Sequence, residues 1–396
     1  MKEVKNRFVK QTVFILAIFF ILSVNLSCEK EDTPSVPTKV NQTLLMYLPW
    51  SDNLYTYFQT NISDMEKAIG KGILKQERVI VFLSTSVKEA TMFELTYQNG
   101  KIQRKTLKNY TNLPYTTAEG ITSLLNDIKN IAPANQYAMT IGCHGMGWIP
   151  VSKSKVRSIS PVKMHWEYED APLTRYFGGT TSATQTDITT LAKGIADAGL
   201  KMEYIMFDDC YMSTVEVAYD LKHVTDHLIG STSEIMAYGM PYEKIGKYLL
   251  GNVDYEAICN EFYSFYSTFD MPCGTIAVTD CSELDQLAGI MKKINQRYTF
   301  NTEQLNSIQP LDGYSPVIFF DYGDYISKLC DDPELSEQLN IQLNKTIPFK
   351  RNTEYYYSAG KGKIKINTFS GITISDPSQN QLALKKTETN WYKATH

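Results

Sequence analysis

Short apolar runs that alternate with amphipathic segments constrain the fold of this chain more than any other feature. Four runs are bounded by polar or turn residues and have the length of buried strands: Thr43–Leu48, Val79–Leu83, Tyr137–Gly142 and Tyr204–Phe207. Segments with apolar residues at helical spacing separate them: Ile62–Lys71, Thr117–Ile131 and Asp187–Ala198. Alternating strands and helices predict an α/β fold with a mainly parallel central sheet and helices on both faces.

The rest of the chain refines this division. Phe93–Leu107 alternates around Asn99-Gly100, which predicts a β-hairpin, and Leu228–Ser231 and Thr275–Thr279 resemble two further strands. The pattern is less regular after residue 282, and we predict a smaller C-terminal α+β part there. The predicted domains are a signal peptide (1–27), a lipidated Cys with its tether (28–41), a core (42–282) and a C-terminal subdomain (283–396).

The N-terminus has the features of an export signal. Basic residues precede the apolar run Thr12–Val24, which is too short for a comfortable transmembrane helix. The run ends in Leu26-Ser27-Cys28, which resembles the bacterial lipobox, although Asn25 stands where Leu is usual. Glu29–Asp32 resembles the acidic export run of surface lipoproteins in Bacteroides-like bacteria. We therefore expect lipidation at Cys28 and a membrane-anchored protein at the outer membrane or cell surface of a Gram-negative bacterium. Ordinary secretion with an incidental Cys is the alternative.

Charge and cysteine content exclude some classes of protein and leave one question open. The formal net charge is −4, so nothing indicates a nucleic-acid partner. Six cysteines remain besides Cys28, an even number that would allow a disulfide framework in an exported protein. A chain of 396 residues does not need such staples. We expect Cys210 to be a thiol, while pairing of Cys273 with Cys281 stays undecided.

Two stretches combine a His and a Cys at the ends of predicted strands. His144 follows Tyr137–Gly142, and Cys210 follows Tyr204–Phe207. Sites in open parallel sheets lie beyond the carboxyl ends of the strands, so a nucleophile and a base can meet there. Backbone N–H groups near Gly145 and at Cys210 could hold an oxyanion.

Other interpretations of these residues stand beside this one. A Cys after a strand is often a small buried hydrophobic residue, and a His before Gly is often a loop residue. Four other histidines compete with His144 for the role of base: His165, His223, His227 and His396. His223 and His227 have the i, i+4 spacing of metal ligands, but no third ligand follows at a recognisable spacing. We predict no metal site.

Resemblance to a known family favours the catalytic interpretation. Phe207–Met212, continuing through Glu216–Tyr219, resembles the F-D-A-C-L-M…E-V-A-Y block of the clostripain family, cysteine peptidases in the clan of caspases, gingipains and legumain. Cys143–Trp148 resembles that family's H-G-S-G-W stretch. The likeness, which covers roughly Thr43–Pro377, implies a caspase-like fold with His144 as base and Cys210 as nucleophile. It also implies hydrolysis of internal peptide bonds through a thioester.

The resemblance further implies a pocket for Arg or Lys before the scissile bond, with Asp208 as one wall. Positions i and i+2 at a strand end share a side, so Asp208 can lie beside Cys210. The family's second acid lies in a G-D-G-W-P-Y context, but Tyr238 stands at that position here, and Asp209 replaces a small residue. We therefore expect a weaker preference for basic residues.

Two properties of relatives remain open for this chain. Family members cut themselves between the His and the Cys, and this segment holds five basic residues: Lys153, Lys155, Arg157, Lys163 and Arg175. A solvated basic loop is the alternative. Some relatives need calcium; the sequence shows no required cofactor and no EF-hand loop, so calcium stays a candidate.

The sequence thus predicts a lipid-anchored exported cysteine endopeptidase that acts on proteins or peptides. The alternative is a catalytically silent surface lipoprotein of the same fold that binds peptides or host proteins. A third hypothesis is a Cys-dependent transferase that joins proteins.

Overall fold

A computed structural model describes residues 38–51, 53–151, 163–168 and 178–396. Lys39–His396 forms one compact unit. The predicted signal peptide, Cys28 and most of the predicted tether lie outside the described residues, as do Lys153, Lys155, Arg157 and Arg175. No helix of the described part is both long and apolar enough to cross a membrane.

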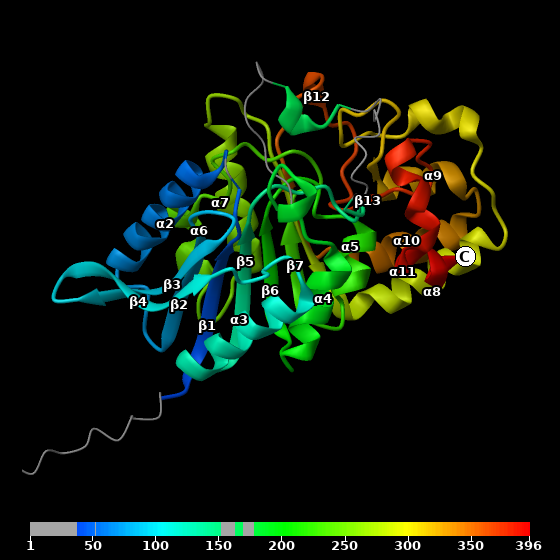
Figure 1. The fold of residues 1–396 in the computed structure, drawn as a ribbon. Coiled ribbons are helices and arrows are strands. Elements are labelled where there is room, and N and C mark those ends of the chain that lie inside the picture. Colours follow the sequence, from blue (N-terminus) through cyan, green and yellow to red (C-terminus); the bar gives the residue numbers. More distant parts are fainter. Residues whose placement is uncertain (1–37, 52, 152–162, 169–177) are drawn as a thin grey trace, which may run out of the picture. The chain divides into compact units, whose positions relative to one another are not determined.

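The described residues build one nine-stranded sheet in the order β10-β8-β7-β6-β5-β1-β2-β3-β4. Its centre is parallel, as predicted, and consists of β7 (Thr225–Gly230), β6 (Met202–Asp208), β5 (Ala134–Gly142), β1 (Val40–Leu48) and β2 (Glu77–Ser84). The central strands are almost continuously buried because helices cover both faces (Figure 1).

Antiparallel strands extend both edges of this parallel centre. They are β3 (Glu89–Gln98) and β4 (Lys101–Thr111) beyond β2, and β8 (Thr275–Asp280) and β10 (Phe349–Asn352) beyond β7. The hairpin at Asn99-Gly100 is confirmed, and both residues have positive φ (51° and 75°), as a two-residue hairpin turn requires. Both further strands predicted from the sequence are present: β7 is parallel to β6, whereas β8 runs antiparallel to β7.

Two groups of helices cover the sheet (Figure 1). One face carries α2 (Tyr55–Gly70), α6 (Tyr242–Ile245) and α7 (Tyr255–Ser267), and the other carries α3 (Ala118–Ile131), α4 (Ile188–Asp197) and α5 (Val215–Leu221). Helix α2 begins seven residues before the predicted Ile62. Phe58 lies four residues before Ile62 and extends the buried face of the helix by one turn. Thr117 and Thr214 cap α3 and α5 through their side chains.

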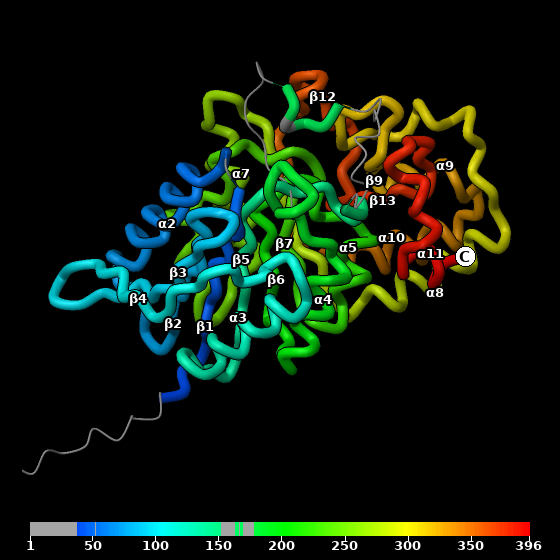
Figure 2. Tube along the Cα trace, viewed as in Figure 1, coloured from blue at the N-terminus to red at the C-terminus, as the bar shows by residue number. Residues whose placement is uncertain are grey.

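The C-terminal third of the chain supplies the remaining elements. They are α8 (Leu284–Asn295), β9 (Phe320–Asp321), α9 (Tyr322–Leu329), α10 (Pro333–Thr346), β11 (Tyr355–Ser358), β12 (Gly362–Lys365), β13 (Thr373–Ile374) and α11 (Asn390–Thr395). Figure 2 shows the red C-terminal segment beside α8, and α11 contacts both α8 and α5. The predicted subdomain 283–396 thus contributes β10 to the main sheet and shares its hydrophobic core.

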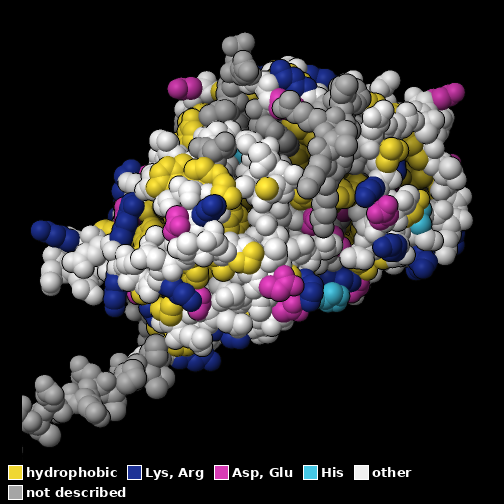
Figure 3. All heavy atoms as spheres, in the orientation of Figure 1, with side chains coloured by type: hydrophobic (Ala, Val, Ile, Leu, Met, Phe, Trp, Pro, Cys, Tyr) yellow, Lys and Arg dark blue, Asp and Glu magenta, His cyan; other side chains and the backbone are white. Residues whose placement is uncertain are grey.

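The surface carries charges of both signs, and the described cysteines lie in the interior. Figure 3 shows acidic and basic side chains interspersed on the face that it draws. The six cysteines of the described part are all buried thiols, so Cys273 and Cys281 do not pair.

Glu216 and Asp376 form a buried acidic pair whose protonation makes stability depend on pH. Burial first, and then the charge of Asp376, raises the pKa of Glu216 to about 8. Burial likewise raises the pKa of Asp376 to about 7, although nearby Lys386 lowers it. Three of their four carboxylate oxygens have no direct hydrogen-bond partner among the described residues. The folded state therefore holds protons that the unfolded chain, with carboxyl pKa values of roughly 4, releases.

We predict that the free energy of unfolding falls as pH rises from about 5 to about 8, by up to roughly 6 kcal/mol. Glu216→Gln should flatten this dependence, because an amide cannot ionise. Urea unfolding across that pH range measures both. Glu243→Gln is the control, since Glu243 is half exposed and its pKa is lowered by Lys71. A wild-type stability that rises through the same range would contradict the prediction.

Candidate active site

The predicted His and Cys stretches lie side by side at the carboxyl ends of two central strands, β5 and β6. β5 and β6 are parallel neighbours, and Gly142 pairs in register with Asp208. The residues that follow each strand therefore leave the sheet at the same level. Both His144 and Cys210 are completely buried.

Asp209 ties the two strand ends together. Its Oδ1 accepts a hydrogen bond from the Cys143 backbone N–H at 2.6 Å, and its Oδ2 lies 3.6 Å from the Cys143 sulfur. Asp208 points elsewhere, as expected for neighbouring strand residues, and its Oδ1 accepts from the Met240 N–H at 2.8 Å. The unusual Asp209 thus has a structural contact that the sequence does not reveal.

Gly145 lies directly against the Cys210 backbone. A Cβ atom at position 145 would sit 2.1 Å from the Cys210 carbonyl oxygen and 3.0 Å from the Cys210 nitrogen. Only a glycine allows this approach, because a Cβ atom closer than 3.0 Å to the Cys210 backbone would force one of the two segments to shift. The loop after His144 and the start of the Cys loop therefore meet at one point.

His144 is held by groups from two other segments. Its ring Nε2 lies 2.7 Å from the Asn53 Oδ1, just before α2, and its backbone N–H donates to the Gly178 carbonyl at 3.3 Å. Because an amide oxygen only accepts, Nε2 carries the proton in this contact. Asn53 was not among the site residues predicted from the sequence.

The Cys210 side chain lies against the segment after β7. The Ile235 backbone N–H donates to the Cys210 sulfur at 3.2 Å. Tyr211, the next residue, has a positive φ of 59°, and its hydroxyl donates to Glu234 at 2.7 Å. A non-glycine residue in this region is strained, and such strain concentrates at functional sites.

Distant parts of the chain brace both loops from outside. Ser213 Oγ donates to the Gly371 carbonyl at 2.8 Å, and Trp148 Nε1 donates to Ser375 Oγ at 2.9 Å. The Glu216 Oε1 accepts from the Ser375 N–H at 2.8 Å. These contacts attach the segment around β13 to the His and Cys loops together.

His165 also reaches this site from the segment between the two stretches. Its ring lies edge-on to His144, with centroids 6.2 Å apart, and edge-on to Tyr211 at 5.7 Å. Its Nδ1 is 3.0 Å from the Tyr314 hydroxyl. His165 is thus a neighbour of His144, whereas His223 and His227 lie around the start of β7, at the opposite end of the strands.

Asp208 and Tyr238, the predicted pocket residues, are linked through one short loop. Met240, which binds Asp208, follows Tyr238 by two residues, and the Tyr238 hydroxyl donates to Asp64 Oδ2 on α2 at 2.5 Å. A buried carboxylate therefore contacts the side chain that stands where the family pattern has its second acid, and it belongs to α2.

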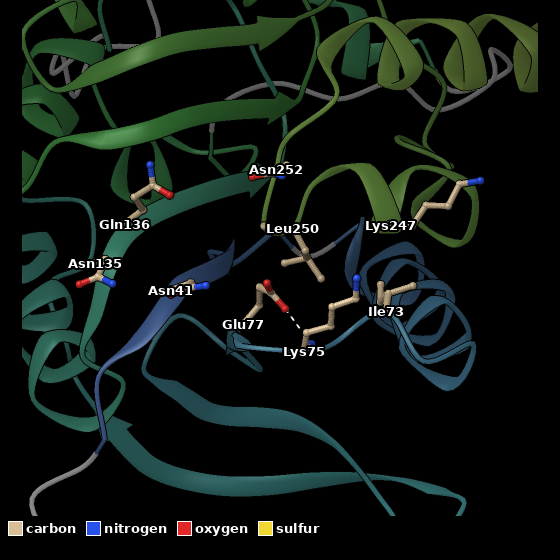
Figure 4. Close-up of a pocket in the computed structure, with 10 residues that line it drawn as sticks. Asn41, Ile73, Lys75, Glu77, Asn135, Gln136, Lys247, Leu250 and Asn252 are labelled. Atoms are coloured by element: carbon tan, nitrogen blue, oxygen red, sulfur yellow. Dashed lines mark hydrogen bonds between the residues drawn. The ribbon is translucent and has the colours of Figure 1, made fainter.

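A separate cavity of about 600 Å³ lies where β1, β2 and β5 begin, at the end of the sheet away from His144 and Cys210. Figure 4 shows its polar lining, which includes Lys75, Glu77 and Asn41. Among the described residues, no group of three or more His, Cys, Asp or Glu side chains could hold a metal ion.

Comparison with known proteins shows the family to which this chain belongs. A family model described as the clostripain family matches residues 46–385. The chain belongs to the clostripain family. It is therefore a cysteine protease with an α/β, caspase-like fold, as the sequence predicted. A search of curated proteins found no match.

Solved structures agree with this clostripain-family assignment. A secreted cysteine protease of Bacteroides thetaiotaomicron, called iotapain, is 66% identical with a TM-score of 0.85, over 91% of this chain and 100% of that chain. A clostripain of the same species, in complex with the peptide inhibitor BTN-VLTK-AOMK, is 71% identical with a TM-score of 0.56, over 56% of this chain and 99% of that chain. An inactive zymogen protease from Parabacteroides distasonis shares the fold, with 24% identity, a TM-score of 0.75, and coverage of 91% of this chain and 99% of that chain.

Proposed function

We propose that this clostripain-family protease hydrolyses internal peptide bonds with Cys210 as nucleophile and His144 as general base. The observation that carries the proposal is the meeting of Gly145 with the Cys210 backbone, which joins the two loops at the carboxyl ends of β5 and β6. Asn53 positions the His144 ring, and its contact with Nε2 leaves Nδ1 as the basic nitrogen of a neutral imidazole.

The proposed reaction proceeds in two steps. His144 takes the thiol proton while the Cys210 sulfur attacks the substrate carbonyl, and the C–N bond then breaks to leave a thioester and a free amine, which takes up that proton. Water next attacks the thioester, with His144 as base, and releases the acid and the thiol. The N–H groups of Gly145 and Cys210 are the proposed oxyanion donors, each worth roughly 3 kcal/mol in the transition state.

Labelling of Cys210 tests this proposal directly. A peptide with a thiol-reactive acyloxymethyl ketone should label the wild-type protein at Cys210, and His144→Ala should slow the labelling strongly. Tandem mass spectrometry locates the modified residue. If a folded wild-type protein neither reacts nor cleaves any member of a peptide library, the silent peptide-binding lipoprotein becomes the better description. Ligated products would favour a transferase.

We further propose a basic residue before the scissile bond, with Asp208 as the charged wall of the pocket. The 71%-identical relative was solved with an inhibitor whose printed sequence, VLTK, ends in Lys. Asp208 is buried, and a buried carboxylate attracts a cation by a charge-assisted hydrogen bond.

The wild type should cleave after Lys or Arg in preference to Leu, but less selectively than a pocket with two direct carboxylates, since Tyr238 carries no charge. Asp208→Asn should lower kcat/KM for the basic substrates by about 10- to 100-fold, the range of one hydrogen bond to a charge. Matched peptides that differ only at that residue measure the ratio. Strong, sole selectivity for Arg in the wild type would contradict it.

We also propose self-processing, and two described residues between His144 and Cys210 that contact His144 support this proposal. His165 packs on His144, and the Gly178 carbonyl binds the His144 backbone. Both catalytic residues have 0% exposure, so a substrate reaches them only after a neighbouring group has moved. Lys163, on the surface, is one basic cleavage candidate within the described residues. Intact mass of wild type and Cys210→Ala decides whether the chain cuts itself.

Export and lipid anchoring at Cys28 complete the proposed function. The 66%-identical relative is described as secreted, which supports export, while the lipobox-like sequence supports anchoring in the outer membrane or at the cell surface. Incorporation of labelled palmitate that is lost in Cys28→Ala tests the anchor. We propose no required cofactor; activity that persists in a calcium chelator would support this.

A further inference from the structure

Residues 235–240, hereafter the 235–240 loop, touch both halves of the proposed site through their backbone. At its start the Ile235 N–H binds the Cys210 sulfur, and at its end the Met240 N–H binds Asp208 Oδ1. The position of this loop therefore sets where the pocket carboxylate lies relative to the nucleophile.

The two ends of the loop are anchored by different groups. Just before Ile235, the side chains of Ser231 and Ser233 bond with the buried Thr275 hydroxyl at 2.7 and 3.0 Å. These hydrogen bonds join the segment after β7 to the first residue of β8, and Tyr238 takes no part in them. The start of the loop is therefore held independently of its end.

Two buried polar residues of α2 hold the end of the loop. Asn61 and Asp64, spaced i, i+3, lie on the same helix face and are 0% and 2% exposed. Asn61 Nδ2 donates to the Tyr238 carbonyl at 2.8 Å, and the Tyr238 hydroxyl donates to Asp64 Oδ2 at 2.5 Å. The Tyr238 ring stacks on Phe265 of α7, with centroids 4.9 Å apart.

A buried carboxylate on an amphipathic helix is costly unless its hydrogen bonds are made. Asp64 has two: Tyr238 on one oxygen and Lys67 Nζ at 2.8 Å on the other. The pair Tyr238–Asp64 is thus a charge-assisted contact between α2 and the loop, and such bonds are the stronger kind. Burial first, and then Asp64, raises the pKa of Tyr238, so the phenol keeps its proton at neutral pH.

We propose that Asp64, acting through Tyr238, is a positioning residue that determines specificity by fixing the end of the 235–240 loop and with it Asp208. This inference rests on the proposed function. It explains how a chain with Tyr in place of the expected second acid retains a defined pocket: the carboxylate comes from α2 and acts on the loop.

A double-mutant cycle tests the pair, with steady-state kinetics on a peptide that has Lys before the scissile bond. Tyr238→Phe and Asp64→Asn should each raise KM by about tenfold and change kcat by less than about threefold. The double variant should be no worse than either single variant, since both remove the same bond. Alkylation of Cys210 by iodoacetamide should stay within about twofold of wild type.

Glu66→Gln is the matched control, because Glu66 lies on the same helix and joins it to β4 through an ion pair with Arg104 at 2.6 Å. It should leave KM unchanged. Additive effects, an unchanged KM in Tyr238→Phe, or equal losses in kcat and in alkylation rate would overturn the inference. A wild type that hydrolyses nothing would instead overturn the proposed function, so the two failures are distinguishable.

Discussion

Replacing Cys210 with alanine should abolish peptide hydrolysis while the protein stays folded. The sulfur forms the covalent bond in the proposed mechanism, and no neighbouring group replaces it, so kcat/KM should fall by at least about 10⁴-fold. The cost in stability should be small, on the order of 1 kcal/mol, because the substitution removes one sulfur atom and its hydrogen bond with the Ile235 N–H. Turnover of a Lys-containing fluorogenic peptide and a melting curve measure the two effects.

Cys259→Ala is the control for this substitution. Cys259 is a buried thiol in α7, and burial raises its pKa to about 12, so it is not a reactive thiolate. This variant should keep wild-type turnover and labelling. Loss of activity in Cys259→Ala, or persistent turnover in purified Cys210→Ala, would refute the assignment of the nucleophile.

Gly145→Ala should have the second largest effect. The added methyl group would lie 2.1 Å from the Cys210 carbonyl oxygen and 2.9 Å from the Asp209 Cβ, both parts of the Cys loop. The two loops must move apart to admit it, and a displacement of about 1 Å at a catalytic site costs roughly 100-fold in rate. We expect kcat/KM to fall by about 10²- to 10³-fold.

Two other glycines separate this effect from a general loss of folding. Gly289→Ala meets no atom within 4 Å, and in the middle of α8 it should stabilise the protein slightly. Gly194→Ala meets Ile121 at 2.7 Å, away from the site, so it should lower the melting temperature without changing kcat/KM of the folded protein. Gly145→Ala with wild-type kcat/KM would show that the two loops do not need this approach.

Local sequence patterns were sufficient to predict the strands that carry the proposed catalytic residues. Each apolar run that predicted a central strand is a strand, and the register of β5 and β6 brings the residues after them together. The reason is that burial on both faces leaves a continuous apolar run, which is visible in one sequence. His144 and Cys210 are recognisable because each follows such a run.

Contacts between distant segments could not be predicted in the same way. Tyr238 meets Asp64 across 174 positions of the chain, and Asn53 meets His144 across 91. Neither pair has a periodic signal, because a hydrogen bond between segments far apart in the sequence depends on how those segments pack in the fold. The antiparallel direction of β8 could not be predicted either, since an apolar run does not encode the direction of its strand.

The hydrogen bonds from the segment around β13 to the His and Cys loops determine when during biogenesis the site can be complete. Trp148 and Glu216 bond with Ser375, and Ser213 bonds with Gly371, so the two loops of the site receive these partners from residues made long after Cys210. A polypeptide that is still being synthesised or threaded through a membrane lacks them. The proposed proteolytic machinery is therefore completed only when almost the whole described chain is available, which couples proteolysis to the end of biogenesis.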